Sequence, residues 1–273
     1  MNIKKYTDAN REAWNEATLK HQEARVAKKL DYKKKFSKKG FSTLDNIETA
    51  RLKAIGLKGK RVAQVCCNNG RETLSLVNLG AKSAVGFDIS DEAIKEALEL
   101  AKISGLNCKF VRTDVYDIGE EYNNSFDLIY ITIGAMGWLP DLNRFFKVVS
   151  KMISPGGHLM IYEHHPFLYM IARDGETEFD QKDPLKIVHP YFRTEPWVSN
   201  DGIDYIGGTR YESKTSYDFT HTTADILNSI IGSGIRLLEF MEYAHDISTE
   251  FKEHEKEGKI PLSFILIGKK DDK

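Results

Sequence analysis

Cysteine is scarce in this sequence, and no long apolar run occurs in it. The 273 residues include 3 cysteines, two of which, Cys66 and Cys67, are adjacent, a poor spacing for an ordinary disulfide. A disulfide scaffold is therefore excluded, and free thiols indicate a reducing, cytoplasmic setting. Because no stretch of about 18 apolar residues is present, we expect no membrane span, and the first residues lack the apolar core of a secretory signal.

The composition is that of a globular protein with an uneven charge distribution. Hydrophobic residues make up 41% and charged residues 29%, which argues against disorder. The net charge is −1, yet residues 1–60 alone carry 16 basic and 7 acidic side chains. The densest basic stretch, residues 33–39, is a candidate phosphate or nucleic-acid patch. Since aromatic residues are not regularly interleaved there, we predict instead a solvated, flexible segment between two helices.

From residue 61 onward, strand patterns alternate with helix patterns, after a helix that Thr7 and Asp8 are predicted to cap. This alternation predicts a parallel sheet that is covered by helices on both faces. Residues 166–235 interrupt it, and we expect the two strands that follow to pair antiparallel at one edge. The predicted strands are 61–66, 83–88, 108–112, 126–132, 158–163, 235–243 and 261–267, and the predicted helices are 71–79, 91–104, 142–153 and 223–232.

The turn after the first predicted strand has the residues of a ligand-binding loop. In an open α/β sheet, ligands bind at the carboxyl ends of the strands. Asn68 tolerates left-handed backbone better than most residues, and the N–H groups of such a turn form an anion site with the helix that follows. Asp88 ends the second strand, 18 residues past Gly70. An acid at that place accepts hydrogen bonds from ribose hydroxyls, although it could also merely cap the next helix.

Two further features lie at strand ends. Asp114 follows the third strand, where a carboxylate can accept from an adenine amino group, and Gly156-Gly157 turns directly into the fifth. Together with the antiparallel final strand and the long helical lead-in, these features resemble the class I S-adenosylmethionine-dependent methyltransferases.

The resemblance is closest to a group of bacterial small-molecule-type methyltransferases. The shared segments are Asn10-Arg11-Glu12-Ala13-Trp14 with His21 two turns later, Gly86-Phe87-Asp88-Ile89-Ser90, Ile133 through Asp141, Glu163-His164-His165-Pro166, and Phe219-Thr220-His221. One departure concerns the first loop, where the general class has an acid and two more glycines. This chain has Gln64, Cys66 and Asn68 there.

The resemblance implies a doubly wound, mostly parallel seven-stranded α/β sheet, the Rossmann-like methyltransferase fold, with an antiparallel last strand. All of residues 1–273 would form one domain. Residues 1–60 would be a helical lead-in, 61–165 the cofactor-binding core, 166–235 a substrate-covering insertion and 236–273 a strand pair.

The resemblance also implies how S-adenosylmethionine, and its product S-adenosylhomocysteine, would be held. The first loop would line the methionine end, the second strand end the ribose, the third the adenine and the fourth the sulfonium, while the first helix closes the pocket. Ordinary helix packing is the alternative for Trp14 and His21. The residues concerned are Trp14, His21, Cys66, Cys67, Asn68, Gly70, Asp88, Ile89, Ser90, Asp114, Val115, Thr132 and Ile133.

Candidates for catalysis are His165, His221 and Glu163. A hydroxyl or ammonium acceptor needs a base, and histidine titrates near neutral pH. Glu163 could orient either histidine, while His164 ranks lower because the resemblance gives it no matched partner. The alternative is that both histidines shape turns. No metal site is predicted, since Glu163, His164 and His165 lack the i,i+4 spacing of helix-borne ligands.

We therefore expect methyl transfer from S-adenosylmethionine to a small molecule, whose acceptor atom remains open. A non-catalytic cofactor-binding module is the main alternative. A nicotinamide dehydrogenase disagrees with the missing glycines and the long lead-in. A nucleic-acid methyltransferase would use the basic segment, yet Ile133-Gly134-Ala135-Met136 stands where base-methylating enzymes have an Asn/Asp-Pro-Pro-aromatic loop.

Overall fold

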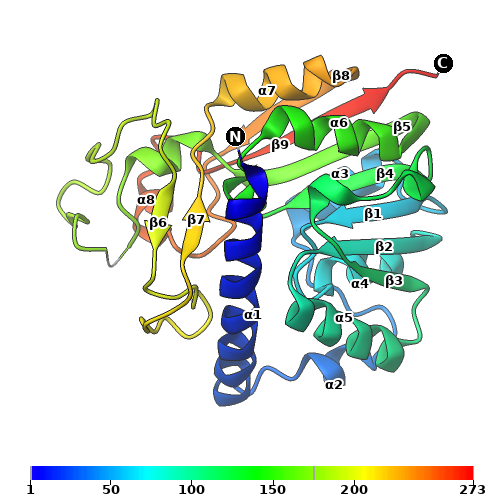
Figure 1. Ribbon diagram of the computed structural model, residues 1–273, viewed down its shortest axis with the longest axis horizontal. Coiled ribbons are helices and arrows are strands. Elements are labelled where there is room, and N and C mark those ends of the chain that lie inside the picture. The colour runs from blue at the N-terminus through cyan, green and yellow to red at the C-terminus, as the bar shows by residue number, and fades with distance from the viewer. Residues whose placement is uncertain (1, 175, 273) are drawn as a thin grey trace.

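Seven strands form one twisted sheet in the computed structural model, which describes residues 2–174 and 176–272 (Figure 1). The strands are β1 (Arg61–Val65), β2 (Ser83–Asp88), β3 (Cys108–Arg112), β4 (Phe126–Thr132), β5 (Ile153–His164), β8 (Ile235–Tyr243) and β9 (Ser263–Lys270). Their order is β3-β2-β1-β4-β5-β9-β8. β1 to β5 pair in parallel, and β9 pairs antiparallel with both β5 and β8. The predicted seven-stranded sheet with an antiparallel last strand is confirmed.

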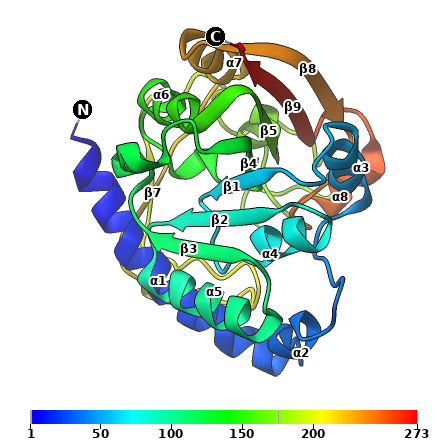
Figure 2. The same cartoon turned by 90° about the vertical axis from the view of Figure 1, so that its right-hand side faces the viewer.

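Alternation along the central strands feeds two cores, one on each face of the sheet. In β4, Ile129 and Ile131 pack with α6 and α7, whereas Leu128 and Tyr130 pack on the face that α3 and α4 cover. Figure 2 shows these helix pairs on opposite sides of the sheet. The helices are α3 (Asn46–Ala54), α4 (Arg71–Asn78), α5 (Asp91–Ser104), α6 (Leu142–Met152) and α7 (Thr223–Gly232).

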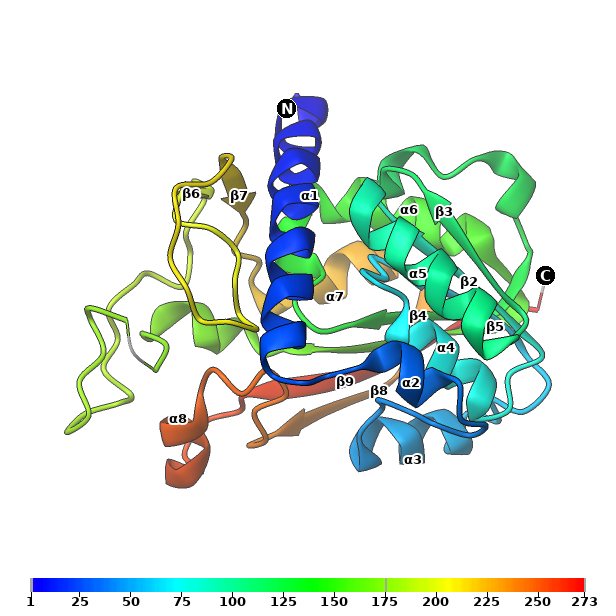
Figure 3. The ribbon, with the colours of Figure 1, turned by 90° about the horizontal axis from the view of Figure 1, so that it is seen from below.

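The first helix, α1 (Ile3–Ala27), crosses the carboxyl ends of the parallel strands. It packs against α5 on one side and against β7 (Ser216–Asp218) on the other. Figure 3 shows it between the sheet domain and the hairpin that β7 forms with β6 (Trp197–Ser199). The helix begins earlier than predicted, because the side chain of Asn2 accepts the N–H of Lys5 (3.4 Å) and so provides the cap.

The basic segment is more ordered than the sequence predicted. Residues Tyr32–Phe36 form a short helix, α2, capped by the Asp31 side chain. Phe36 is buried in a small core with α4 and α5, which leaves the lysines on the outer side. The prediction of a flexible segment is therefore wrong for these residues, since one buried aromatic ring anchors them.

Other differences are local. β5 begins at Ile153 and runs through the predicted Gly-Gly turn, β9 extends to Lys270, and a short helix, α8 (Lys252–Glu257), separates the last two strands. Within the described residues, no helix is long and apolar enough to cross a bilayer. Short 3₁₀ turns are Val115–Asp117, Glu120–Tyr122, Met136–Trp138 and Pro166–Met170.

Candidate active site

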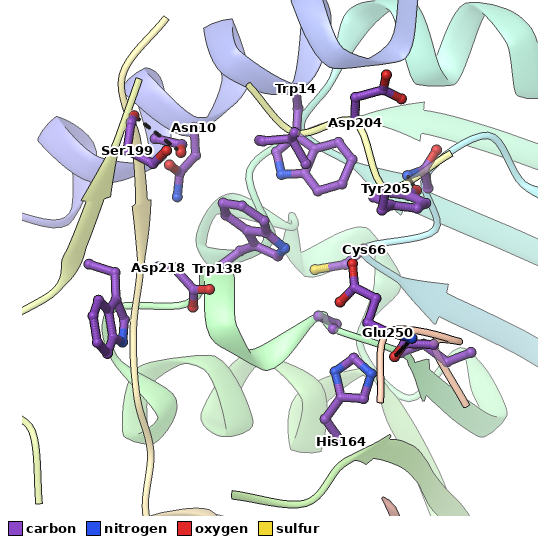
Figure 4. A pocket seen from close by; sticks show the side chains of 18 of the residues that line it. Asn10, Trp14, Cys66, Trp138, His164, Ser199, Asp204, Tyr205, Asp218 and Glu250 are labelled. Carbon is purple, nitrogen blue, oxygen red and sulfur yellow. Dashed lines mark hydrogen bonds between the residues drawn. The ribbon is translucent and has the colours of Figure 1, made fainter. Parts of the chain in front are cut away.

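A cavity of about 970 Å³ opens at the carboxyl ends of the parallel strands, between the sheet, α1 and the segment 166–222 (Figure 4). Ten of the thirteen predicted cofactor residues line it, although they come from five separate parts of the chain. They are Trp14, Cys66, Cys67, Asn68, Asp88, Ile89, Asp114, Val115, Thr132 and Ile133.

The first loop is held by left-handed backbone at alternate positions. Cys66 (φ 56°), Asn68 (φ 48°) and Gly70 (φ 74°) all have positive φ. Asn68 has the left-handed backbone conformation that its residue type was predicted to tolerate. Cys66 has the same conformation although it is neither Asn nor Gly. Burial raises the pKa of the Cys66 and Cys67 thiols well above their usual range, which favours the neutral thiol form of both.

Asp88 ties the first loop to the second strand end. Its carboxylate accepts the backbone N–H of Asn68 (2.7 Å) and of Ser90 (2.9 Å). Burial raises the pKa of Asp88, and these N–H groups oppose that rise because they favour the charged form. The carboxylate therefore does more than cap the next helix, since it holds two loops and lines the cavity.

Three predicted residues lie behind the wall of the cavity. A side chain on Gly70 would meet the Phe110 ring at 2.4 Å, so glycine is required there for packing. Ser90 caps α5 by accepting the Ala93 N–H (3.1 Å). His21 is buried behind Trp14, and burial lowers its pKa to about 4, which keeps it neutral.

Asp114 serves as an anchor for α1. One carboxylate oxygen accepts from the Thr7 hydroxyl (2.8 Å) and the Lys4 ammonium (2.8 Å), and the other accepts the Tyr116 N–H (3.0 Å). Both oxygens thus have protein donors, which fixes the start of α1 beside the expected adenine pocket.

Glu163 shapes the loop that follows β4. Its carboxylate accepts three successive backbone N–H groups, those of Gly134, Ala135 (2.8 Å) and Met136 (3.2 Å), and also the N–H of His164 (2.9 Å). It contacts neither His165 nor His221 in the structure. The expected orienting role toward those histidines is therefore not what the carboxylate does.

The structure brings neither His165 nor His221 to the cavity wall. His165 is 1% exposed, with Nδ1 accepting the Phe167 N–H (3.2 Å) and Nε2 lying 2.9 Å from a Glu242 carboxylate oxygen. Nε2 of His221 lies 2.9 Å from the Leu139 carbonyl oxygen. Both rings are engaged in packing and turns, the alternative that the sequence left open, and burial lowers the pKa of both.

His164 lines the cavity in their place. Its Nδ1 lies 3.8 Å from the Glu163 carboxylate, and its Nε2 is buried without a hydrogen-bond partner among residues 2–174 and 176–272. The same is true of the Thr132 hydroxyl at the end of β4. Two residues of the cavity wall, Thr132 at the end of β4 and His164 at the end of the neighbouring β5, therefore each carry a buried polar atom without a hydrogen-bond partner in the described residues.

The hairpin supplies residues that the sequence did not predict. The Asn10 side chain donates to the Tyr217 carbonyl (2.9 Å) and accepts the Tyr217 N–H (2.7 Å), which explains the asparagine of the shared Asn-Arg-x-x-Trp segment. The hydroxyl of Tyr205 lies 3.4 Å from the Asn68 amide, and its ring packs 4.4 Å from that of His21. The loop of the hairpin thus covers the first loop of the core.

Asp218, at the end of β7, has the most perturbed carboxylate of the cavity. Burial raises its pKa to about 7, against the opposing charge of Arg173. One of its oxygens, Oδ1, lacks a hydrogen-bond partner in the described part of the chain. No sequence signal marked this residue, because it lies within an irregular segment.

Acidic side chains dominate the wall of the cavity. Among the described residues that line the cavity, nine carry a carboxylate and three are arginines, namely Arg71, Arg173 and Arg210. From the core come Glu72, Asp88 and Asp114. From the covering segments come Asp174, Glu176, Asp201, Asp204, Asp218 and Glu250. The cavity therefore favours positive over negative ligands.

Comparison with known proteins agrees with this geometry. A model of a family described as "Methyltransferase domain" matches residues 62–157, which run from β1 into β5. The core of the chain, residues 62–157, therefore matches a methyltransferase family, as the sequence predicted. The fold and family that the sequence predicted are confirmed, and S-adenosylmethionine is the methyl donor of this family.

The curated relatives of this chain differ in their acceptors. A phthiotriol/phenolphthiotriol dimycocerosates methyltransferase of Mycobacterium leprae is 33% identical over 46% of this chain and 44% of its own. A tRNA U34 carboxymethyltransferase of Campylobacter fetus is 31% identical over 50% of this chain and 47% of its own. The chain thus spans about half the length of these curated relatives.

Solved methyltransferase structures share the fold. One from Mesorhizobium loti has a TM-score of 0.60 at 21% identity and covers 81% of this chain and 96% of its own. One from Clostridium acetobutylicum has a TM-score of 0.57 at 16% identity and covers 93% of this chain and 98% of its own.

Proposed function

We propose that this protein transfers a methyl group from S-adenosylmethionine to a small-molecule acceptor bound beneath the segment 166–222. The observation that carries the proposal is the cavity itself. It lies at the strand ends where the family binds its cofactor, and it continues under the hairpin, where an acceptor has room. A large concave site with convergent polar groups is the expected form of such an active site.

The residues of the inner half suit the cofactor. Asp88 would bind the ribose, Ile89 and Val115 would flank the adenine, and the loop through Cys66 and Asn68 would meet the methionine end. When bound, S-adenosylmethionine supplies a methyl group that its sulfonium activates toward nucleophiles. The surplus of carboxylates in the wall complements that positive charge.

The protein's own contribution is orientation and exclusion of water. α1 and the hairpin cover the strand ends together, joined by the paired hydrogen bonds between Asn10 and Tyr217. Holding reactants in line contributes about 7–11 kcal/mol in well-aligned systems. A covered cavity with fixed walls is the structural basis for such alignment.

The cofactor half of the proposal is tested with Asp88→Ala. Two charge-assisted hydrogen bonds are worth about 1.5–3 kcal/mol each, so the variant should bind S-adenosylhomocysteine at least about tenfold more weakly in calorimetry. Its apo melting temperature should fall as well, because the backbone N–H groups of Asn68 and Ser90 lose their acceptor.

Asp127→Ala is the matched control. Asp127 lies at the opposite end of the sheet and pairs with Arg61 (2.7 Å), so this variant should melt earlier and keep its S-adenosylhomocysteine affinity. Equal affinity of wild type and Asp88→Ala would remove Asp88 from the site. A protein that binds S-adenosylhomocysteine but methylates nothing would favour the non-catalytic alternative.

An RNA acceptor is the second candidate, because relatives such as the tRNA U34 carboxymethyltransferase act on RNA. The lysines of α2 would be the natural phosphate contacts. However, no residue of α2 is among those that line the cavity in the described structure, and the cavity wall is acidic. We therefore rank an RNA acceptor below a small molecule.

A further inference from the structure

The half of the cavity beyond the cofactor residues contains a carboxylate that the structure leaves unsatisfied. Asp218 ends β7, and the Phe219 N–H that follows it donates to the Gly137 carbonyl (2.7 Å), which fixes this strand end against the Met136–Trp138 turn. Oδ1 of Asp218 is buried, and no described residue donates to it. A buried carboxylate oxygen without a donor is costly, so a ligand that brings a donor gains affinity there.

Gly137 creates the space for this carboxylate. A Cβ placed on Gly137 would lie 2.6 Å from Oδ1 of Asp218 and 2.8 Å from the hydroxyl of Tyr169. Both polar atoms therefore converge on one point that any larger residue would fill. This convergence makes a compact polar end to the cavity, with an acid and a hydroxyl side by side.

The nearby positive charge is already matched. Arg173 lies 3.4 Å from the Glu250 carboxylate and 3.9 Å from that of Glu176. Asp218, by contrast, makes no ion pair among the described residues. A group that donates hydrogen bonds, and above all an ammonium, complements it, whereas a phosphate or carboxylate is repelled.

A second side chain with a polar atom that lacks a hydrogen-bond partner in the described residues, that of His164, lies nearer to the cofactor residues. His164 is the last residue of β5. Tyr162, two residues earlier, is paired in register with Thr132, so His164 lies beside the end of β4. The Glu163 carboxylate, fixed by backbone N–H groups, lies 3.8 Å from Nδ1. Nε2 is buried without a hydrogen-bond partner in residues 2–174 and 176–272, on a residue that lines the cavity. In Figure 4 the Trp138 indole lies between Asp218 and Cys66, an apolar wall between the two halves.

We propose that the acceptor is a small alcohol or phenol carrying a second, hydrogen-bond-donating or cationic group, which Asp218 binds while His164 takes the proton of the reacting hydroxyl. This inference rests on the proposed function. The hydroxyl oxygen forms a bond to the methyl carbon as the carbon–sulfur bond breaks, with that electron pair staying on sulfur. The hydroxyl proton passes to Nε2 of His164 and from there to solvent.

The charge preference is tested with three phenols that differ only at the end of the side chain: tyramine, 4-ethylphenol and 3-(4-hydroxyphenyl)propionate. Their binding to S-adenosylhomocysteine-saturated protein is measured by ligand-observed NMR. We expect tyramine to bind at least about tenfold more tightly than the propionate, with 4-ethylphenol between them. Asp218→Asn should abolish the preference, and Gly137→Ala should weaken all three by filling the space beside Oδ1.

Asp8→Asn, an exposed position of α1 outside the cavity wall, is the control and should keep the preference. Propionate binding equal to or tighter than tyramine binding, or no binding by tyramine and 4-ethylphenol, would overturn the inference. Calorimetry with S-adenosylhomocysteine alone separates this failure from that of the proposed function, which falls only if the cofactor product does not bind.

The role of His164 is tested by transfer of tritiated methyl groups to tyramine and 4-ethylphenol. His164→Gln should lower kcat by about 10²-fold or more, with KM for the phenol within a few-fold, because a base acts in the transition state. His158→Gln, six residues earlier in β5 and not among the described residues that line the cavity, is the matched control and should retain kcat. Unchanged kcat in His164→Gln, or a wild type that methylates neither phenol, would overturn the assignment.

Discussion

A shift of one residue separates the histidine that the sequence favoured from the one that faces the cavity. His165 was preferred because it matched the resembling motif, but side chains near a strand end alternate between faces. A slip of one position therefore moves a side chain to the opposite side. Here it places His164 in the wall and leaves His165 in contact with Glu242. Motif matching locates such a site to within a residue, and the backbone direction decides the rest.

The buried carboxylate of Asp218 makes the stability of the fold depend on pH. Its pKa is raised from about 4 to about 7, by burial first and by the charge of Glu163 as well, against Arg173. The folded state then binds more protons than the unfolded state between these values, so stability falls as pH rises through that window. Tyr169, in the same pocket, stays neutral because burial and Asp218 raise its pKa.

We expect the melting temperature of Asp218→Asn, relative to that of the wild type, to rise between pH 5 and pH 8, because the variant lacks the carboxyl group that releases its proton in this window. Glu48 is buried on the other face of the sheet, and burial raises its pKa to about 7 as well. It therefore makes a second, similar contribution to the dependence of stability on pH. Glu48→Gln therefore serves as the parallel measurement, and calorimetric scans at several pH values give both profiles. Identical profiles for wild type and Asp218→Asn would contradict the charge state assigned to Asp218.

At the scale of elements, the sequence predicted the regular parts and missed the irregular ones. Helices and strands with strong periodicity, such as α5, were found to the residue, because their patterns and caps are local. The hairpin of β6 and β7 was not predicted, since its strands have only three residues each and depend on α1 for packing. The part of the cavity wall that contains Asp218 was missed for the same reason.

The hydrogen bonds of Asn10 are the main polar tie between α1 and the hairpin. Asn10→Ala removes one acceptor and one donor from Tyr217, both partly buried, and should lower the free energy of unfolding by about 1–3 kcal/mol. Asn10→Asp keeps the acceptor but turns a buried carboxylate oxygen toward the Tyr217 carbonyl oxygen, so it should lose at least as much. Urea denaturation measures the difference, and calorimetry should show weaker S-adenosylhomocysteine binding in Asn10→Ala. Equal stability of the three proteins would mean that water replaces the side chain without cost.

At the scale of the whole molecule, the basic residues of the N-terminal segment and the acidic residues of the cavity lie on different surfaces. The basic residues of the lead-in lie partly on α2, where Lys33 pairs with Glu99 (2.8 Å) on α5. The acidic residues converge on the cavity. Composition alone revealed the asymmetry along the chain but not its direction in space, which depends on how α1 and α2 pack.

We expect RNA to bind no more tightly than about 10⁻⁶ M at physiological salt, the range of non-specific binding. Replacing Lys34, Lys35, Lys38 and Lys39 by Gln should weaken this binding and its salt dependence without changing S-adenosylhomocysteine affinity. Fluorescence anisotropy with labelled RNA measures the first effect and calorimetry the second. Sequence-selective, submicromolar RNA binding would favour the RNA acceptor over the small molecule.

The tie between Asn10 and Tyr217 joins positions 207 residues apart. During synthesis at about 5–20 residues per second, Asn10 leaves the ribosome about 10 to 40 seconds before its partner does. α1 can meanwhile dock on α5 through Arg11 and Asp91 (2.7 Å), since that contact closes much earlier. In a nascent chain, α1 and the parallel strands β1 to β5 are therefore synthesised before β7, the second strand of the hairpin that covers the cavity. The strand ends proposed to bind the cofactor are thus synthesised before the end of the hairpin that covers the rest of the cavity.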